Sequence, residues 1–153
     1  MSDHETALPV LGISHVAFTV TDMEPAASFW TGAMGFETVI ENPRFSLLVH
    51  RGMNLGVGIT DHDATAAGPF DERRVGLDHL AFAVGDADSL RAWEQRLTGL
   101  GIPHSGITES DDGHHLNLRA PDNVAIELYV MSESFLAAIG TGGPADPVGP
   151  PSR

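Results

Sequence analysis

Two histidines and one glutamate in this chain are of the types that hold a catalytic metal ion. His15 and His79 each stand at the start of an apolar stretch, and Glu127 lies inside a third. Two neutral imidazoles and one carboxylate on the same face of a cation form a 2-His-1-carboxylate set, which leaves coordination positions open for substrate or water. We therefore expect these residues to bind one divalent metal ion, Fe²⁺, Mn²⁺ or Zn²⁺.

The two histidines occupy the same position in an internal repeat. Residues 12–22 (GISHVAFTVTD) align with residues 76–86 (GLDHLAFAVGD), so that His, Ala, Phe, Val and Asp coincide in the two copies. A single histidine at the start of an apolar strand is usually an ordinary structural residue. Its recurrence at one place in a duplicated unit favours a shared site, because related halves bring equivalent positions together.

The elements that must position these residues follow the same order in both copies. Apolar residues at helical spacing follow Asp22 and Asp86, which stand where a helix N-cap would, and Gly35 and Gly101 stand where each helix would stop. The strands expected after the helices are 36–40, 45–50, 54–60, 102–108, 114–119 and 124–130. The sequence thus predicts an α+β fold of two βαβββ modules that form curved mixed sheets.

The domain spans residues 10–131, with module 1 at about 10–60, a linker at 61–75 rich in Asp, Ala, Gly and Pro, and module 2 at about 76–131. A short terminal helix is expected at 132–139, and a disordered Gly/Pro-rich tail at 140–153.

Alternation along strands predicts which side chains face the interior. In the first strand of each unit, the histidine and the small residues after it face away from the helix, and Glu127 does so in the last strand. By the same alternation, His115, Asn117 and Arg119 face inward in the strand at 114–119. Ser46, Leu48 and His50 are expected to face inward in the equivalent strand of the first unit. We expect His50, His115 and Tyr129 to take part in proton transfer or hydrogen bonding, and Asn117 and Arg119 to contact the substrate. For each of these residues, the alternative is a polar side chain at the rim of the sheet without a role in catalysis.

These patterns resemble the vicinal oxygen chelate superfamily, which includes glyoxalase I, fosfomycin-resistance transferases, methylmalonyl-CoA epimerase, type I extradiol dioxygenases and bleomycin-resistance proteins. The resemblance covers about residues 10–131 and rests on the two histidine strands and on residues 118–129 (LRAPDNVAIELY). It implies that His15, His79 and Glu127 are the metal ligands. It also implies a homodimer in which modules from two chains complete each barrel, the alternative being a barrel closed within one chain.

Departures from the family pattern leave the reaction open. The repeat alignment puts Gly58 where glyoxalase I and the epimerase have a fourth ligand. Asn117 stands where extradiol dioxygenases and fosfomycin-resistance enzymes have a tyrosine, ten residues before the ligand glutamate, and Ala17 stands where the latter have a threonine. The resemblance implies a metal-dependent enzyme that acts on a small oxygen-rich molecule, dioxygenase-like or lyase/isomerase-like. The alternatives are an antibiotic-resistance protein that modifies or sequesters a drug, and a non-catalytic small-molecule-binding module.

Composition limits the partners. The net charge is −13, with 8 basic residues that are all arginine, so nucleic acid is not an expected partner. The chain has no cysteine, which excludes thiolate ligands and disulfides. No apolar run approaches the roughly 20 residues of a membrane span. We expect a cytoplasmic protein that binds a small-molecule substrate and does not bind membranes.

Overall fold

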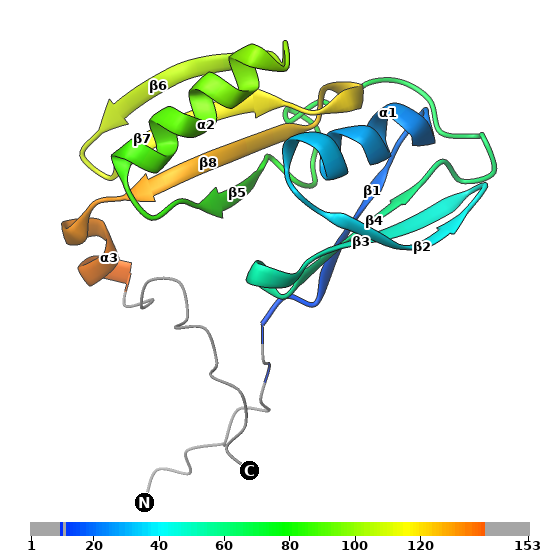
Figure 1. Ribbon diagram of the computed structural model, residues 1–153, viewed down its shortest axis with the longest axis horizontal. Helices are drawn as coiled ribbons and strands as arrows, with labels where there is room; N and C mark the ends of the chain where they lie inside the picture. The colour runs from blue at the N-terminus through cyan, green and yellow to red at the C-terminus, as the bar shows by residue number, and fades with distance from the viewer. Residues whose placement is uncertain (1–9, 11, 140–153) are drawn as a thin grey trace, which may run out of the picture.

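The structure, a computed structural model, describes residue 10 and residues 12–139 and consists of two modules joined by the linker (Figure 1). The first module contains β1 (His15–Thr19), α1 (Met23–Ser28), the π-helical turn η1 (Phe29–Ala33), β2 (Glu37–Asn42), β3 (Phe45–His50), the 3-10 turn η2 (Arg51–Met53) and β4 (Leu55–Thr60). The second contains β5 (Leu80–Ala83), α2 (Ala87–Gly99), β6 (His104–Ser110), β7 (Gly113–Arg119), the 3-10 turn η3 (Pro121–Asn123) and β8 (Ala125–Met131), and α3 (Glu133–Ile139) follows. The tail predicted at 140–153 lies outside the described residues.

Each module forms a four-stranded mixed sheet, and the two sheets have equivalent strand orders, β1-β4-β3-β2 and β5-β8-β7-β6. The first and last strands of each module pair in parallel, and the other neighbours pair antiparallel. Ala17 lies opposite Gly58 in the first sheet, and Ala81 lies opposite Glu127 in the second. The predicted α+β fold and the βαβββ order of both modules are therefore confirmed.

The predicted helix boundaries follow from local chemistry. The side chains of Asp22 and Asp86 accept hydrogen bonds from the backbone amides of Glu24 and Ser89, so both aspartates cap their helices. Gly35 and Gly101 follow the two helices with φ of 78° and 68°, a left-handed conformation that glycine adopts without a side-chain clash.

A single hydrophobic core connects the two modules. Helices α1 and α2 each pack on one face of the sheet of their own module, and the ring of Trp30, from η1, contacts both Phe18 of β1 and Phe82 of β5. Arg96 of α2 donates hydrogen bonds to the carbonyls of Gly32 and Ala33, at 2.6 and 3.0 Å. We call the face of each sheet that its helix does not cover the open face.

The parity predicted for β3 was wrong. Ser46 and Leu48 are buried on the helix side, with 4% and 0% of their surface exposed, so they do not face the interior of a barrel. Their neighbours Phe45, Leu47 and Val49 line the open face instead. The parity predicted for β7 is correct, because Leu116 is fully buried.

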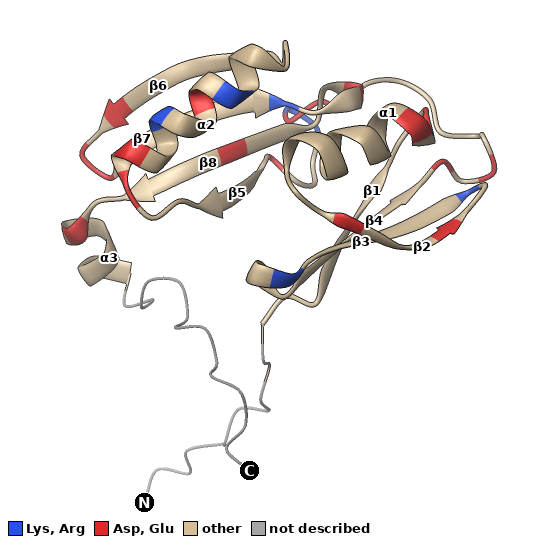
Figure 2. Cartoon of the chain, viewed as in Figure 1, with Lys and Arg blue, Asp and Glu red and all other residues tan. Residues whose placement is uncertain are grey.

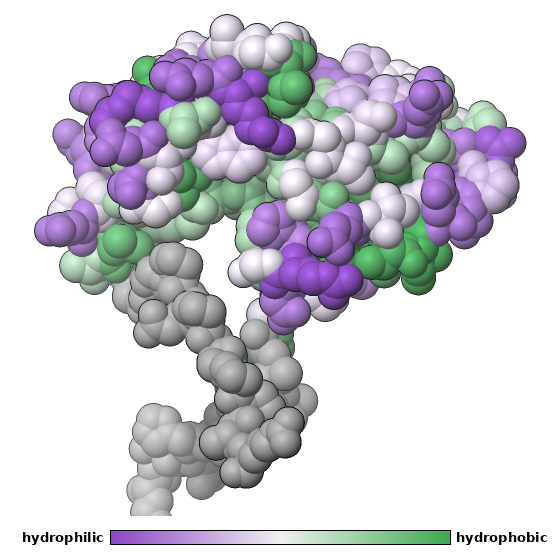
Figure 3. Space-filling view, in the orientation of Figure 1, coloured by the Kyte–Doolittle hydropathy of each residue, from purple (hydrophilic) through white to green (hydrophobic). Residues whose placement is uncertain are grey.

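Acidic residues are distributed along both modules (Figure 2). Hydrophobic surface appears at the edge where β2 lies (Figure 3), and this strand exposes Val39 and Ile40 at 45% and 49%. None of the helices in the described part of the chain has the length and apolar character that crossing a membrane requires.

Candidate metal centre and its surroundings

His79 and Glu127 face each other on the open face of the second sheet. His79 immediately precedes β5, and Glu127 stands in β8 beside it. The distance between His79 Nε2 and Glu127 Oε2 is 3.4 Å. The other ring nitrogen of His79 lies 2.6 Å from Asp78 Oδ1. Because a carboxylate only accepts, Nδ1 carries a proton, and in the neutral form of the ring Nε2 presents a lone pair to Glu127.

A third polar side chain holds the second oxygen of Glu127. His115 Nδ1 lies 2.8 Å from Glu127 Oε1, and His115 Nε2 lies 2.9 Å from Ser110 Oγ. The His115 ring stacks on Tyr129, with 4.4 Å between the ring centroids and 16° between the planes. Glu127 is more enclosed than either histidine, since 13% of its side chain is exposed, compared with 43% for His79 and 22% for His115.

Tyr129 is anchored by its hydroxyl, which donates to the carbonyl of Asp112 at 2.8 Å. Burial, together with the carboxylates of Asp112 and Glu127, raises the pKa of Tyr129 above its ordinary value. The phenol therefore stays protonated at neutral pH and acts as a hydrogen-bond donor. Asn117 lies opposite Glu127 in the β7–β8 ladder and, with His79, lines a hollow of about 200 Å³.

Arg119, expected to bind substrate, is paired within the chain. Its guanidinium donates to both carboxylate oxygens of Glu72, at 2.7 and 3.1 Å, and to the carbonyl of Asn123. The hydrogen bond from Arg119 is the main reason that the pKa of Glu72 is lowered to about 2. Arg119 borders the same hollow as His79, but its charge is already balanced by the linker carboxylate.

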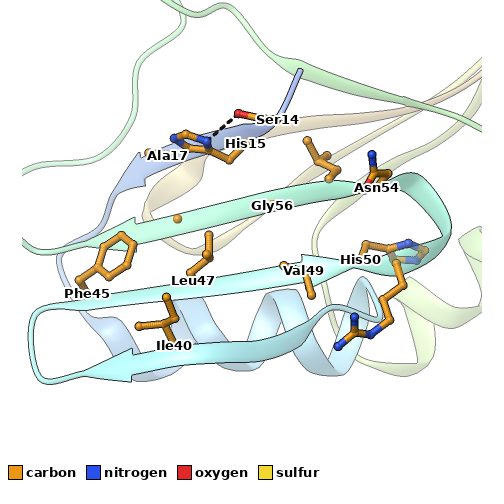
Figure 4. Close-up of a pocket in the computed structure, with 13 residues that line it drawn as sticks. Ser14, His15, Ala17, Ile40, Phe45, Leu47, Val49, His50, Asn54 and Gly56 are labelled. Atoms are coloured by element: carbon orange, nitrogen blue, oxygen red, sulfur yellow. Dashed lines mark hydrogen bonds between the residues drawn. The ribbon is translucent and has the colours of Figure 1, made fainter. Parts of the chain in front are cut away.

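His15 lies on the open face of the first sheet beside an apolar hollow of about 720 Å³ (Figure 4). Its Nδ1 is 2.9 Å from Ser14 Oγ, so Nε2 is left for another partner, as in His79. Phe45, Leu47 and Val49 of β3 and Ile40 of β2 form the apolar walls, and the small residues Ala17, Gly56 and Gly58 form the floor. We call this cavity the apolar hollow.

His50 ends β3 and borders the apolar hollow. Its Nδ1 accepts a hydrogen bond from the amide of Met53 at 3.2 Å, and its ring packs edge-on against Phe36 with 5.4 Å between ring centroids. The structure therefore separates the two histidines expected to move protons, since His50 lies on the first sheet and His115 on the second.

The second sheet brings together His79, Glu127, His115, Asn117 and Tyr129, and His15 stands apart on the first sheet. Among the residues that the structure describes, no three His, Cys, Asp or Glu side chains of one chain converge to hold a metal ion. The half-site of His79 and Glu127 nevertheless fits a cation. Two ligand atoms that each lie about 2.0–2.2 Å from one cation stand about 3.0–3.5 Å apart, as these two do.

Three polar residues around the half-sites were not singled out from the sequence. Ser14 and Asp78 bind the Nδ1 atoms of the two repeated histidines, and Ser110 binds His115. The signal for the first two was present in the repeat, because a polar residue precedes the histidine in both copies. Such neighbours fix the orientation of a metal-binding imidazole.

Comparison with known proteins places these features in a family. Residues 12–128 match the model of the Glyoxalase/Bleomycin resistance protein/Dioxygenase superfamily. A solved glyoxylase/bleomycin resistance protein/dioxygenase domain from Frankia sp. EAN1pec is 30% identical, with a TM-score of 0.73, and the match covers 81% of this chain and all of that one. A lactoylglutathione lyase from Agrobacterium tumefaciens, 18% identical over 80% of this chain and 96% of that chain, shares the fold with a TM-score of 0.66.

MhqA from Bacillus subtilis (strain 168), whose name assigns it to the ring-cleaving dioxygenases, is 25% identical over 132 residues. The match covers 82% of this chain but only 41% of MhqA, so this chain spans about two fifths of that relative. The superfamily includes dioxygenases and lyases, and its sequence model covers both histidine strands and Glu127. The chain therefore belongs to the glyoxalase/bleomycin resistance protein/dioxygenase superfamily.

Proposed function

We propose that this protein is an enzyme that binds one divalent metal ion with His79 and Glu127 of one chain and His15 of a second copy, and that it acts on a small oxygen-rich molecule. The reaction is dioxygenase-like or lyase/isomerase-like.

The observation that carries the proposal is the close approach of a ring nitrogen of His79 to a carboxylate oxygen of Glu127 on the second sheet. His79 Nδ1 donates a hydrogen bond to Asp78, so in the neutral ring the lone pair of Nε2 faces Glu127 Oε2, 3.4 Å away. Two acceptors at this distance repel each other unless a cation or a proton lies between them, and burial of Glu127 strengthens the effect. A divalent ion satisfies both groups, and nitrogen and oxygen ligands without sulfur suit Fe²⁺, Mn²⁺ or Zn²⁺.

The third ligand is argued from the duplication. His15 holds the same place in its module as His79, and its Nδ1 is likewise bound by the preceding residue. Both open faces expose small side chains, including Ala17 and Ala81, to solvent in the single chain. A symmetric dimer would cover both faces and bring the first sheet of each chain to the second sheet of the other.

The residues around the centre indicate how a substrate would be held. When bound, the metal ion would supply Lewis-acid stabilisation to two neighbouring oxygens of the substrate. The apolar hollow beside His15 would bind the non-polar part of the molecule and exclude water. Asn117 is exposed beside Glu127 and offers an amide to a substrate oxygen. Protonated Tyr129 keeps its stacking partner His115 in place.

A heterodimer experiment tests the proposal. We expect His15→Ala, His79→Ala and Glu127→Ala homodimers each to lose most of the bound metal, measured by elemental analysis after gentle purification, and His104→Ala to keep it. A heterodimer of one His15→Ala chain and one His79→Ala chain, isolated with two affinity tags, retains one intact site if ligands cross between chains. Its metal content should be about half that of wild type. A heterodimer without metal, or homodimeric variants with undiminished metal, would contradict the proposal.

The apolar hollow favours a second candidate, a protein that binds and sequesters a drug. Its walls of Ile40, Phe45, Leu47 and Val49 need no cation to hold an apolar ligand. This function is supported instead if wild type retains no metal in the elemental analysis.

A further inference from the structure

We propose that His115 is a positioning residue that fixes the carboxylate of Glu127 so that Oε2 alone faces the metal ion. This inference rests on the proposed function and assigns a role to a residue outside the three ligands.

The contacts of His115 form a continuous support for Glu127. Its Nδ1 lies 2.8 Å from Oε1, the oxygen that does not face His79. Because a carboxylate only accepts, Nδ1 donates the hydrogen bond to Glu127, and Nε2 lies 2.9 Å from the hydroxyl of Ser110. The two ring nitrogens are thus both used, and the donor is directed at one carboxylate oxygen.

Packing prevents the imidazole from turning away. The ring stacks on Tyr129 at 4.4 Å, and Tyr129 is tied by its hydroxyl to the carbonyl of Asp112 in the β6–β7 turn. Only 22% of the His115 side chain is exposed. The β7–β8 ladder pairs His115 with Tyr129, two positions along from the pair of Asn117 and Glu127. The orientation of Glu127 is therefore set by the second sheet itself, before any cation binds.

This arrangement matters for the metal because a carboxylate can bind through one oxygen or both. A donor on Oε1 withdraws that oxygen and leaves Oε2, 3.4 Å from His79 Nε2, for the ion. It also lowers the conformational entropy that Glu127 loses when it binds the ion. Loss of such an outer-shell partner typically weakens metal binding by about 10–100-fold.

Two substitutions at His115 separate its hydrogen bond from its bulk. Asn places an amide close to the position of Nδ1 and can still donate to Glu127, whereas Phe keeps the stack on Tyr129 and donates nothing. We expect the Zn²⁺ affinity of His115→Asn, measured by chelator competition, to lie within a few fold of wild type. We expect His115→Phe to bind about 10–100-fold more weakly. His114→Asn, the same change at the adjacent residue, should leave the affinity unchanged.

A measurement without metal separates this inference from the proposed function. In the metal-free protein, we expect a double-mutant cycle of His115→Phe and Glu127→Gln on unfolding by urea to show coupling between the two side chains. Equal Zn²⁺ affinity of wild type and His115→Phe, or additive effects in the cycle, would overturn the role of His115. Coupling in the cycle with a wild type that binds no Zn²⁺ would overturn the proposed function, and with it any role of His115 toward a cation.

Discussion

Arg119 shows how far a single residue can be interpreted from its type. The alternation of β7 places its side chain on the open face, where a guanidinium would suit an anionic substrate. The structure instead pairs it with Glu72, a linker residue 47 positions away, through two hydrogen bonds. Nothing in the spacing of the two residues indicates this contact, because the path of a linker is not set by any periodic pattern.

The Glu72–Arg119 pair makes stability depend on pH. The pKa of Glu72 is lowered to about 2 from an ordinary value of 4.5, chiefly by the hydrogen bond from Arg119. A carboxyl whose pKa is lower in the folded state stabilises that state above its unfolded pKa, and loses this contribution as pH falls through its folded pKa. We therefore expect Glu72→Gln to lower the urea midpoint at pH 7, and the difference from wild type to narrow between pH 4.5 and 2.

Glu37→Gln provides the matched control for this pair. Glu37 also pairs with an arginine, Arg51, but both side chains are largely exposed, at 64% and 72%. Exposed pairs contribute little. A difference between Glu72→Gln and wild type that stays constant across this pH range would count against the ion pair as its source.

The candidate metal ligands were easier to identify from the sequence than the residues around them. His15 and His79 were identified because the repeat places them at one position of two copies, and Glu127 because an acidic residue interrupts an apolar strand. The parallel pairing of β5 and β8 brings His79 beside Glu127, and their side chains approach to 3.4 Å. The support given by Asp78 and Ser110 depends on side-chain rotamers, and a sequence pattern does not specify these.

At the level of elements, β3 explains the one parity error. Its sequence, FSLLVH, has apolar residues on both faces, with Leu48 on one and Phe45, Leu47 and Val49 on the other. Alternation cannot orient such a strand. The structure resolves the ambiguity because the open face is itself apolar in the first module, where it forms the walls of the apolar hollow.

The start of β7 depends on a glycine. Gly113 has φ of 144°, and a Cβ at this position would lie 2.0 Å from the carbonyl oxygen of Val130 and 3.0 Å from the Tyr129 ring. We expect Gly113→Ala to lower the free energy of unfolding by about 1–3 kcal/mol from backbone strain alone, and by more as β8 moves away. Urea denaturation followed by circular dichroism measures the change.

Gly85→Ala is the control, since a Cβ there would meet no atom within 4 Å and the backbone is not in the left-handed region. If the two variants proved equally stable, the tight contact between Gly113 and β8 would not exist in solution.

At the level of the whole molecule, the modules share a core rather than fold side by side. Trp30 is 3% exposed and contacts rings from both sheets. Large-to-small changes at such positions usually cost about 3–5 kcal/mol. We expect Trp30→Ala to lower the free energy of unfolding by that amount, and to do so in both modules at once.

The remaining tryptophan, Trp93 of α2, reports on the second module. In the Trp30→Ala variant, the fluorescence of Trp93 should change at the same lowered urea concentration as the circular dichroism of the whole chain. The control is Thr31→Ala, a substitution at the exposed residue next to Trp30, which should leave the urea midpoint near that of wild type. A Trp93 transition that kept the wild-type midpoint would show that the modules unfold independently.

The two copies of the repeated unit differ in the chemistry of their open faces, since one is apolar and the other carries polar side chains. Gly58 faces Ala17 at the place where Glu127 faces Ala81, so the carboxylate belongs to one copy and the apolar hollow to the other. In the proposed enzyme, the side chains that would select the substrate and those that would hold the ion are therefore different residues, although His15 of the first copy borders the hollow. Under that proposal, exchanging Ile40, Phe45, Leu47 or Val49 would change the shape of the hollow and leave His15, His79 and Glu127 in place, so the preferred substrate could change while the metal ligands stay the same.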